Sequence, residues 1–402
     1  MNHPDKGLKI PYTFFSIWSR TEGEAAKASV LEVQPRCINE KALGYPSGYL
    51  YGLPRMESCT METNYPFFRY QFKKSNLPLD IELEAFTPFI PLDERNSGIP
   101  GFRMKYTVTN RSEKEAEVAV CGTMYNFTGF ESYDGYDRLY QEGTPRNTKV
   151  EAEGVTGIVY DNPDMDHGAV NYGSLALMTT NGSATCKPYW QDGGWWDGAE
   201  EFWQDFREDG ELHEDVSSQA VGSNIAASIA PRRVGSISAK ETLKPGESKE
   251  FLFYFTWHFP NRYGWWPDGH CRPSEKSLYD RIWQNYYSTQ WKDAQEAAEY
   301  FISNIEMLEG TSRRFADALY STTLDADVIE SLVSAITVMR SNTCFRIADG
   351  RFFAWEGCFE HAGSCAGTCT HVWNYAQALA FLFPALERSA RRTEFLEETD
   401  EE

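Results

Sequence analysis

Short runs of alternating hydrophobic and polar residues fill the chain from about residue 25 to about residue 260. Residues 101–109 alternate almost perfectly, which predicts a strand with one buried and one solvated face. Similar runs predict further strands at residues 68–72, 80–87, 116–122, 236–243 and 251–257. Gly, Pro, Asn and Asp separate these runs, as is typical of antiparallel strands joined by short turns.

One of the expected connections has a clear turn chemistry. Lys244-Pro245-Gly246-Glu247 separates two strand-like runs, and proline presets the first turn dihedral while glycine tolerates a positive φ. We therefore expect a hairpin here. Because so many strands follow one another without intervening helical patterns, the sequence predicts a large antiparallel β-sandwich rather than a βαβ fold.

The pattern becomes helical after Pro260-Asn261-Arg262 and the aromatic segment that follows them. Helix-forming residues run from about 274 to 320, and Asp325 is expected to cap a further helix. Residues 371–383 are apolar on nearly all sides, which predicts a helix buried on most of its surface. Pro384 either kinks that helix or starts the next one.

Composition and charge argue against several classes of function and location. The chain has 402 residues and a net charge of −21, and it has no Lys/Arg run that could follow a phosphate backbone, so we expect no nucleic-acid partner. No stretch approaches the roughly 20 apolar residues of a membrane span, and the charged first ten residues lack the apolar run of a signal peptide. We therefore expect a cytoplasmic location, with the nine cysteines reduced.

Motifs for cofactor-dependent chemistry are missing from the sequence. It contains no Gly-x-Ser-x-Gly elbow, no Walker loop and no dinucleotide fingerprint, so we expect no cofactor. One alternative is a zinc site in the densest group of soft ligands, Cys358, His361, Cys365, Cys369 and His371. Their spacing matches no standard zinc finger, and cysteines often fill helix cores as small hydrophobes, so we predict no metal.

Three segments carry a family resemblance: residues 80–92, residues 255–262 and residues 351–396. The last is the most specific and contains Trp355-Glu356-Gly357 and the segment Leu382-Phe383-Pro384. With these segments the chain resembles glycoside hydrolase family 116, the bacterial β-glucosidases and relatives that include the non-lysosomal glucosylceramidase. The resemblance implies a retaining β-glycosidase acting on β-glucosides.

The resemblance also implies site residues. Retaining hydrolysis uses two carboxyl groups roughly 5 to 5.5 Å apart, one as nucleophile and one as acid/base. The Glu of the aromatic-Glu-Gly segment is the family's nucleophile, which implies that role for Glu356, with Trp355 offering a flat face to the sugar. The family's second Asp, eleven residues later, is replaced by Gly367. Thr370, His371 and Asn374 are therefore the candidates for hydroxyl contacts, with helix capping and core hydrogen bonding as their alternative roles.

The implied architecture is an α+β multidomain protein. We expect a β-sandwich over residues 1–262, a linker and long helix over 263–310, and the first helices of an (α/α) barrel over 311–402, apparently truncated. The implied acid/base Asp lies beyond residue 402, so we expect this chain alone to be inactive. A non-catalytic carbohydrate-binding sandwich is the alternative, and the oligomeric state stays open. The aromatic segment 190–206 could approach a sugar or merely anchor a loop.

Overall fold

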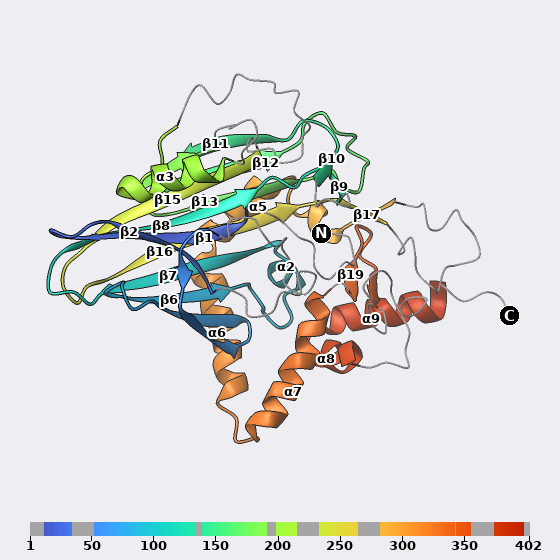
Figure 1. The fold of residues 1–402 in the computed structure, drawn as a ribbon. Helices are drawn as coiled ribbons and strands as arrows, with labels where there is room; N and C mark the ends of the chain where they lie inside the picture. The colour runs from blue at the N-terminus through green and yellow to red at the C-terminus, as the bar shows by residue number, and fades with distance from the viewer. Residues whose placement is uncertain are drawn as a thin grey trace.

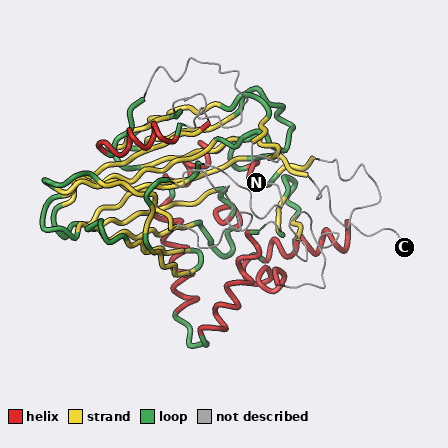
Figure 2. Tube along the Cα trace, viewed as in Figure 1, coloured by secondary structure: helices red, strands yellow, loops and turns green. Residues whose placement is uncertain are grey.

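Two large sheets form most of the computed structural model (Figures 1 and 2), which describes residues 12–33, 52–133, 139–190, 198–214, 233–263, 282–341, 343–354 and 374–397. The first sheet has six strands in the order β14-β15-β8-β1-β2-β3, with bounds Ala184–Lys187, Val234–Leu243, Ala116–Tyr125, Phe14–Thr21, Lys27–Val33 and Arg55–Met56. The second has eight strands in the order β11-β12-β13-β16-β7-β6-β5-β4, with bounds Arg146–Ala152, Val155–Asp161, Ser174–Thr179, Ser248–His258, Gly101–Asn110, Leu79–Phe86, Phe67–Lys73 and Ser58–Asn64.

The sheets pack face to face around one hydrophobic core. Ile17 and Val120 of the six-stranded sheet belong to the same buried cluster as Tyr106 and Phe253 of the eight-stranded sheet. The Phe15 ring lies between the sheets, with its centroid 5.2 Å from that of Tyr106 and 5.1 Å from that of Phe253. This packing confirms the predicted β-sandwich.

The six predicted strands are confirmed, and each lies within or nearly within a strand of the structure. The hairpin at residues 244–247 is also confirmed, because it joins β15 to β16 with Gly246 at φ +76°. The Glu247 amide donates to the Lys244 carbonyl at 3.0 Å and closes the turn.

Helices cover both outer faces of the sandwich. Helices α5 (Ala294–Ser303) and α6 (Ile305–Tyr320) pack on the eight-stranded sheet, where Phe301 contacts Phe86 and Tyr254. On the six-stranded sheet lies α3 (Ala199–Asp209), and its Phe202 stacks on Trp190 with ring centroids 4.5 Å apart. Trp190 is fully buried, so in the described part of the aromatic segment 190–206 these rings anchor the chain to the sandwich.

The helix predicted from about residue 274 begins later than expected. Residues 282–284 form strand β18 (Ile282–Gln284), and a short 3₁₀ helix, η3 (Tyr286–Thr289), follows. The prediction was wrong here because β18 pairs with β17 (Asn261–Tyr263), a partner some twenty residues away that no local pattern reveals. Residues 274–281 lie outside the described ranges, and from Ala294 to Tyr320 the helical prediction is confirmed.

Further helices and short hairpins follow on one side of the sandwich (Figure 1). They are α7 (Ala326–Thr337), the 3₁₀ turn η4 (Val338–Arg340), α8 (Asn374–Leu382), α9 (Pro384–Arg392) and the π-helical turn η5 (Thr393–Glu397), with the hairpin of β19 (Cys344–Arg346) and β20 (Phe352–Ala354) between them. The remaining elements are α2 (Glu94–Ser97), β9 (Phe130–Tyr133) and β10 (Leu139–Gln141).

Two predictions for this helical part are confirmed and one is wrong. The Asp325 carboxylate accepts the Asp327 amide at 3.0 Å and caps α7, and Pro384 starts α9. The expectation that the helix in residues 371–383 is buried on most of its surface is wrong at Phe381, whose side chain is 83% exposed. Apolar composition alone does not say whether a neighbouring element covers each face. None of the helices in the described ranges combines the length and apolar character of a membrane span.

Candidate functional site

A cavity of about 430 Å³ lies where the sandwich meets the helical part. Three segments distant in sequence line it: the α2 region at 89–100, the η3 region at 285–291 and the residues between 339 and 352 that lead into β20. Strand residues Trp257 and Arg262 and helix residues Phe383 and Leu386 complete the described wall. In Figure 1, α2, β17, β19 and α9 lie around this region.

The η3 segment is held in place by polar contacts with the end of β16. The Tyr287 hydroxyl donates to the Phe259 carbonyl at 2.7 Å, and the Asn285 side chain donates to the same oxygen at 2.8 Å. Burial raises the pKa of Tyr287, so its hydroxyl stays protonated and remains a donor. These bonds fix the floor of the cavity to the sandwich.

The opposite wall is the hairpin of β19 and β20. It turns at Asp349-Gly350, where Gly350 adopts φ +95°, a conformation that glycine accepts without strain. The Ala348 amide donates to the Gln284 carbonyl at 2.8 Å, which joins the hairpin to β18. The Arg346 guanidinium carbon lies 3.7 Å from the centre of the Tyr286 ring, so an arginine stacks across the junction.

The cavity is lined by aromatic and cationic groups. Its rings include Trp257, Trp291 and Phe352, which offer flat apolar faces of the kind on which sugar rings pack. Arg340 reaches the wall from η4 and donates to the Pro88 carbonyl at 2.5 Å. Desolvation lowers the pKa of Arg340, an effect that the nearby Tyr65 opposes.

The candidate site residues named in the sequence analysis follow strand β20 in the sequence. Trp355, Glu356, Thr370 and His371 lie outside the described ranges, as do Cys358, His361, Cys365 and Cys369. Asn374 begins α8, and its side chain is not described. The segment bearing Trp355 and Glu356 directly follows β20, whose Phe352 lines the cavity and whose Ala354 is fully buried.

Sequence reasoning missed the arginines of the cavity wall. They come from three segments distant in sequence and follow no common spacing. Arg262, Arg340 and Arg346 have uncharged immediate neighbours and Arg95 follows two acidic residues, so no cationic pattern marks them. The only available signal is their position in segments rich in aromatic residues, which is too general to identify a site.

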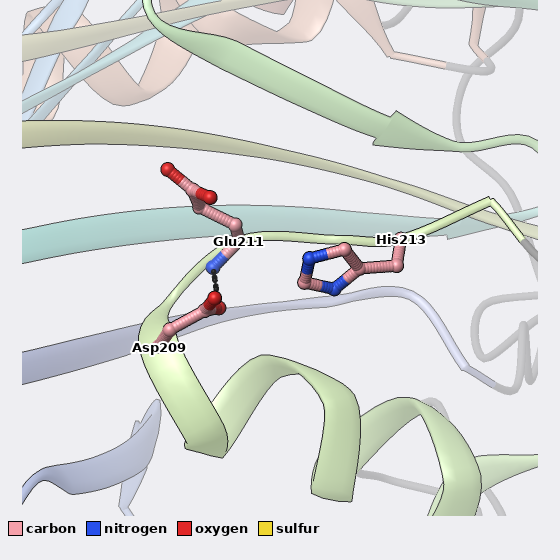
Figure 3. A group of neighbouring side chains, drawn as sticks. All are labelled: Asp209, Glu211 and His213. Atoms are coloured by element: carbon pink, nitrogen blue, oxygen red, sulfur yellow. Dashed lines mark hydrogen bonds between the residues drawn. The ribbon is translucent and has the colours of Figure 1, made fainter.

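A second group of polar side chains lies at the C-terminal end of α3 and consists of Asp209, Glu211 and His213 (Figure 3). Their nearest carboxylate and imidazole atoms lie within 4.8 Å of one another. The Asp209 carboxylate accepts the Glu211 amide at 2.9 Å, and His213 Nδ1 lies 2.8 Å from an oxygen of Asp205. That hydrogen bond raises the pKa of His213.

Two lysines and Asp205 connect this group to the six-stranded sheet. The Lys187 ammonium group is almost fully buried and pairs with Asp205 at 2.9 Å and with Glu201. Lys240 lies 3.8 Å from Glu211 on the other side. His213 and Glu211 therefore belong to a network of ion pairs and hydrogen bonds that ties α3 to the six-stranded sheet, and Asp209 contacts it through the Glu211 amide.

Comparison with known sequences identifies the family. The sequence model described as "beta-glucosidase 2, glycosyl-hydrolase family 116 N-term" matches residues 6–308, about three quarters of the chain. The chain therefore belongs to glycoside hydrolase family 116 and is a glycoside hydrolase-like protein, which confirms the resemblance seen in the sequence. No curated protein matches the chain.

Several solved structures show a distant likeness. A putative kojibiose phosphorylase from the human microbiome has a TM-score of 0.32 at 8% identity, over 76% of this chain and 27% of that one. A polysaccharide lyase has a TM-score of 0.30 at 10% identity, over 63% and 26%. The GH36 α-galactosidase AgaB of Geobacillus stearothermophilus has a TM-score of 0.24 at 6% identity, over 60% and 30%. The chain spans less than a third of each of these proteins.

Proposed function

We propose that this chain supplies the sandwich and the nucleophile of a retaining β-glycosidase that acts on β-glucosides. In this proposal α7, α8 and α9 are the opening helices of an (α/α) barrel, and the domains divide at residues 262 and 310. Glu356 attacks the sugar, and Trp355, Thr370, His371 and Asn374 contact it. A cytoplasmic location, with no metal or cofactor required, completes the proposal.

The observation that carries this proposal is the family match over residues 6–308. Two features of the structure agree with it. The cavity lies between the sandwich and the helical part, and its wall includes Phe352 of the strand that runs into Trp355 and Glu356. Aromatic side chains make up about a third of the described residues of that wall, as suits a carbohydrate ligand.

The proposed chemistry begins with attack of a Glu356 carboxylate oxygen on the anomeric carbon. A C–O bond forms to the enzyme as the bond to the aglycone breaks, and the electron pair leaves with the aglycone oxygen. An acid must protonate that oxygen when the aglycone is an ordinary alcohol, which contributes roughly 10² to 10⁴ in rate. With no acid/base assigned in this chain, we expect slow or undetectable hydrolysis of ordinary glucosides by the chain alone.

An activated substrate tests the nucleophile separately from the acid. A 2,4-dinitrophenyl 2-deoxy-2-fluoro-β-glucoside has a leaving group that departs as an anion without a proton, and its fluorine slows release of the sugar from the enzyme. We expect mass spectrometry of the treated protein to find one fluoroglucosyl group, on the peptide that contains Glu356. Glu356→Gln should abolish the label, whereas Glu360→Gln, four residues away, should retain it.

A label on a different carboxylate would contradict the assignment of Glu356. Complete absence of a label, together with binding of glucosides to the intact chain, would favour the non-catalytic carbohydrate-binding alternative.

A further inference from the structure

The cavity wall is strongly cationic although the chain as a whole is acidic. Among its described residues, one is a glutamate, Glu94, and four are arginines, Arg95, Arg262, Arg340 and Arg346. The whole chain carries a net charge of −21. An excess of guanidinium groups in a concave, partly desolvated site attracts anions more strongly than the same charges on an open surface.

Arg340 is half-buried, and desolvation lowers its pKa. Its two terminal nitrogens donate to the backbone carbonyls of Pro88 and Ile99, at 2.5 and 3.5 Å. No carboxylate within the described ranges forms an ion pair with it. A guanidinium has five N–H groups, so donors remain unused, and a partly desolvated cation without a counter-charge is costly. A bound anion would relieve that cost.

Arg346 of β19 also lines the cavity, and its guanidinium group makes few contacts with other described residues. Its Nε donates to the Gly350 carbonyl at 3.1 Å, and its planar group stacks on Tyr286. Of the carboxylates that the structure describes, none pairs with this arginine either. Stacking holds the guanidinium plane in a fixed orientation while its edge stays able to donate, which suits two-point recognition of a carboxylate or phosphate.

Neutral polar groups and flat apolar faces accompany these charges. Ser97 and Gln290 line the cavity and carry hydroxyl and amide groups that can bond to sugar oxygens. Trp291 also lines the cavity and is only 3% exposed, so it contributes the surface of its ring. Trp257 and Phe352 add apolar surface to the same wall. Such a mixture matches a ligand that has hydroxyl groups, an apolar face and a negative charge.

We propose that this cavity binds an anionic sugar, a pyranose ring bearing a carboxylate or a phosphate, with Arg340 and Arg346 holding the anionic group. The carbohydrate half of this inference rests on the proposed function. The anionic half rests on the charge distribution of the wall alone.

Binding measurements on the full chain can test both halves. Glucuronic acid and glucose 6-phosphate represent the two anionic groups, glucose is the neutral sugar, and inorganic phosphate is the anion without a sugar. By calorimetry, we expect both anionic sugars to bind at least about tenfold more tightly than either glucose or phosphate, since a charge-assisted hydrogen bond and ring packing each contribute. The preference over glucose should shrink as salt is raised.

Variants locate the site. Arg346→Gln should weaken binding of glucuronic acid by about tenfold or more and leave binding of glucose unchanged. Arg340→Gln should act in the same way, and Arg340→Lys, which keeps the charge and a donor for the Pro88 carbonyl, separates loss of binding from loss of folding. The matched control is Arg388→Gln, because Arg388 is an exposed arginine of α9 that does not line the cavity.

The possible outcomes separate the two halves. Equal binding of glucose and glucuronic acid would overturn the anionic half, and equal binding of phosphate and glucose 6-phosphate would overturn the carbohydrate half. Undiminished binding of glucuronic acid by folded Arg346→Gln and Arg340→Gln proteins would place the anion elsewhere and refute the proposal. Labelling at Glu356 is a separate measurement, so this inference can fail while the glycosidase proposal stands.

Discussion

Ion pairs between individual charged residues join helix α6 to the eight-stranded sheet of the sandwich. Glu84 of β6 and Arg103 of β7 are almost fully buried, and both contact charged residues of α6. Arg313 bridges Glu84 at 2.8 Å and Glu309 at 2.7 Å, and Arg103 lies 2.5 Å from Glu309. Burial alone would raise the pKa of Glu309, but hydrogen bonds and charge from Arg103 and Arg313 lower it to about 2. The ionised network is therefore the stable one at neutral pH.

We expect Glu309→Gln to destabilise the protein by about 3 kcal/mol at pH 7, because it leaves buried arginine charge with less compensation. The folded-state pKa lies below the ordinary carboxyl value of 4.5, so this contribution is complete above about pH 4.5 and is lost as the pH falls toward 2. Urea unfolding at pH 7 and pH 3 should show a smaller gap between wild type and variant at pH 3. Glu306→Gln, at an exposed position of α6, should change little at either pH, and an equal gap for Glu309→Gln at both values would contradict the assignment.

Among the elements, those long enough to bury one face in a regular pattern were predictable from sequence. Helix α7 is one example, since Asp325 caps it and Ile329 and Ile336 are buried on one side as their spacing predicts. Strand β7 is another, because its ten residues alternate between the two faces of the sheet. Strand β18 was not predictable, since its three residues are too few to show an alternating pattern and it is defined by its pairing with β17.

The candidate site was predictable to a smaller extent. The segment around Glu356 was found through family resemblance, and the family is confirmed, but the residue's role stays a prediction. The cavity arginines gave no signal because Arg95, Arg262 and Arg346 meet only after the sandwich, β17 and β19 have come together. The position of a side chain on a wall shared by three segments is a property of the tertiary fold.

Removal of the α7 cap tests the contribution of one element. We expect Asp325→Ala to lower the free energy of unfolding by about 1 kcal/mol, because the Asp327 amide loses its acceptor at the start of the helix. Amide hydrogen exchange in the first turn of α7 should accelerate more than exchange in β7 or β16. Glu330→Gln in the same helix is exposed and should stay within about 0.5 kcal/mol of wild type. Unchanged exchange in Asp325→Ala would show that packing alone holds this end.

For the molecule as a whole, α5 links the sandwich to the cavity. Its Ala294, Ala297 and Ala298 are fully buried, and small side chains here let the helix lie directly on β13 and β16. The Thr256 hydroxyl donates to the Ala294 carbonyl at 2.7 Å and fixes the start of the helix. Three residues before Ala294 is Trp291, which lines the cavity, so a shift of α5 away from the sheet must also move that wall.

We therefore expect Ala298→Leu to have two effects. The added methyl groups have no space between α5 and the sheet, so the variant should lose about 1 to 3 kcal/mol of stability. Displacement of Trp291 should also weaken binding of glucuronic acid, although residue 298 does not line the cavity. Glu299→Leu adds a leucine at the neighbouring exposed position of the same helix and should affect neither property. Thermal unfolding and calorimetry of the two variants give the comparison, and a destabilised Ala298→Leu protein with unaltered binding would show that the cavity wall is independent of the helical cover.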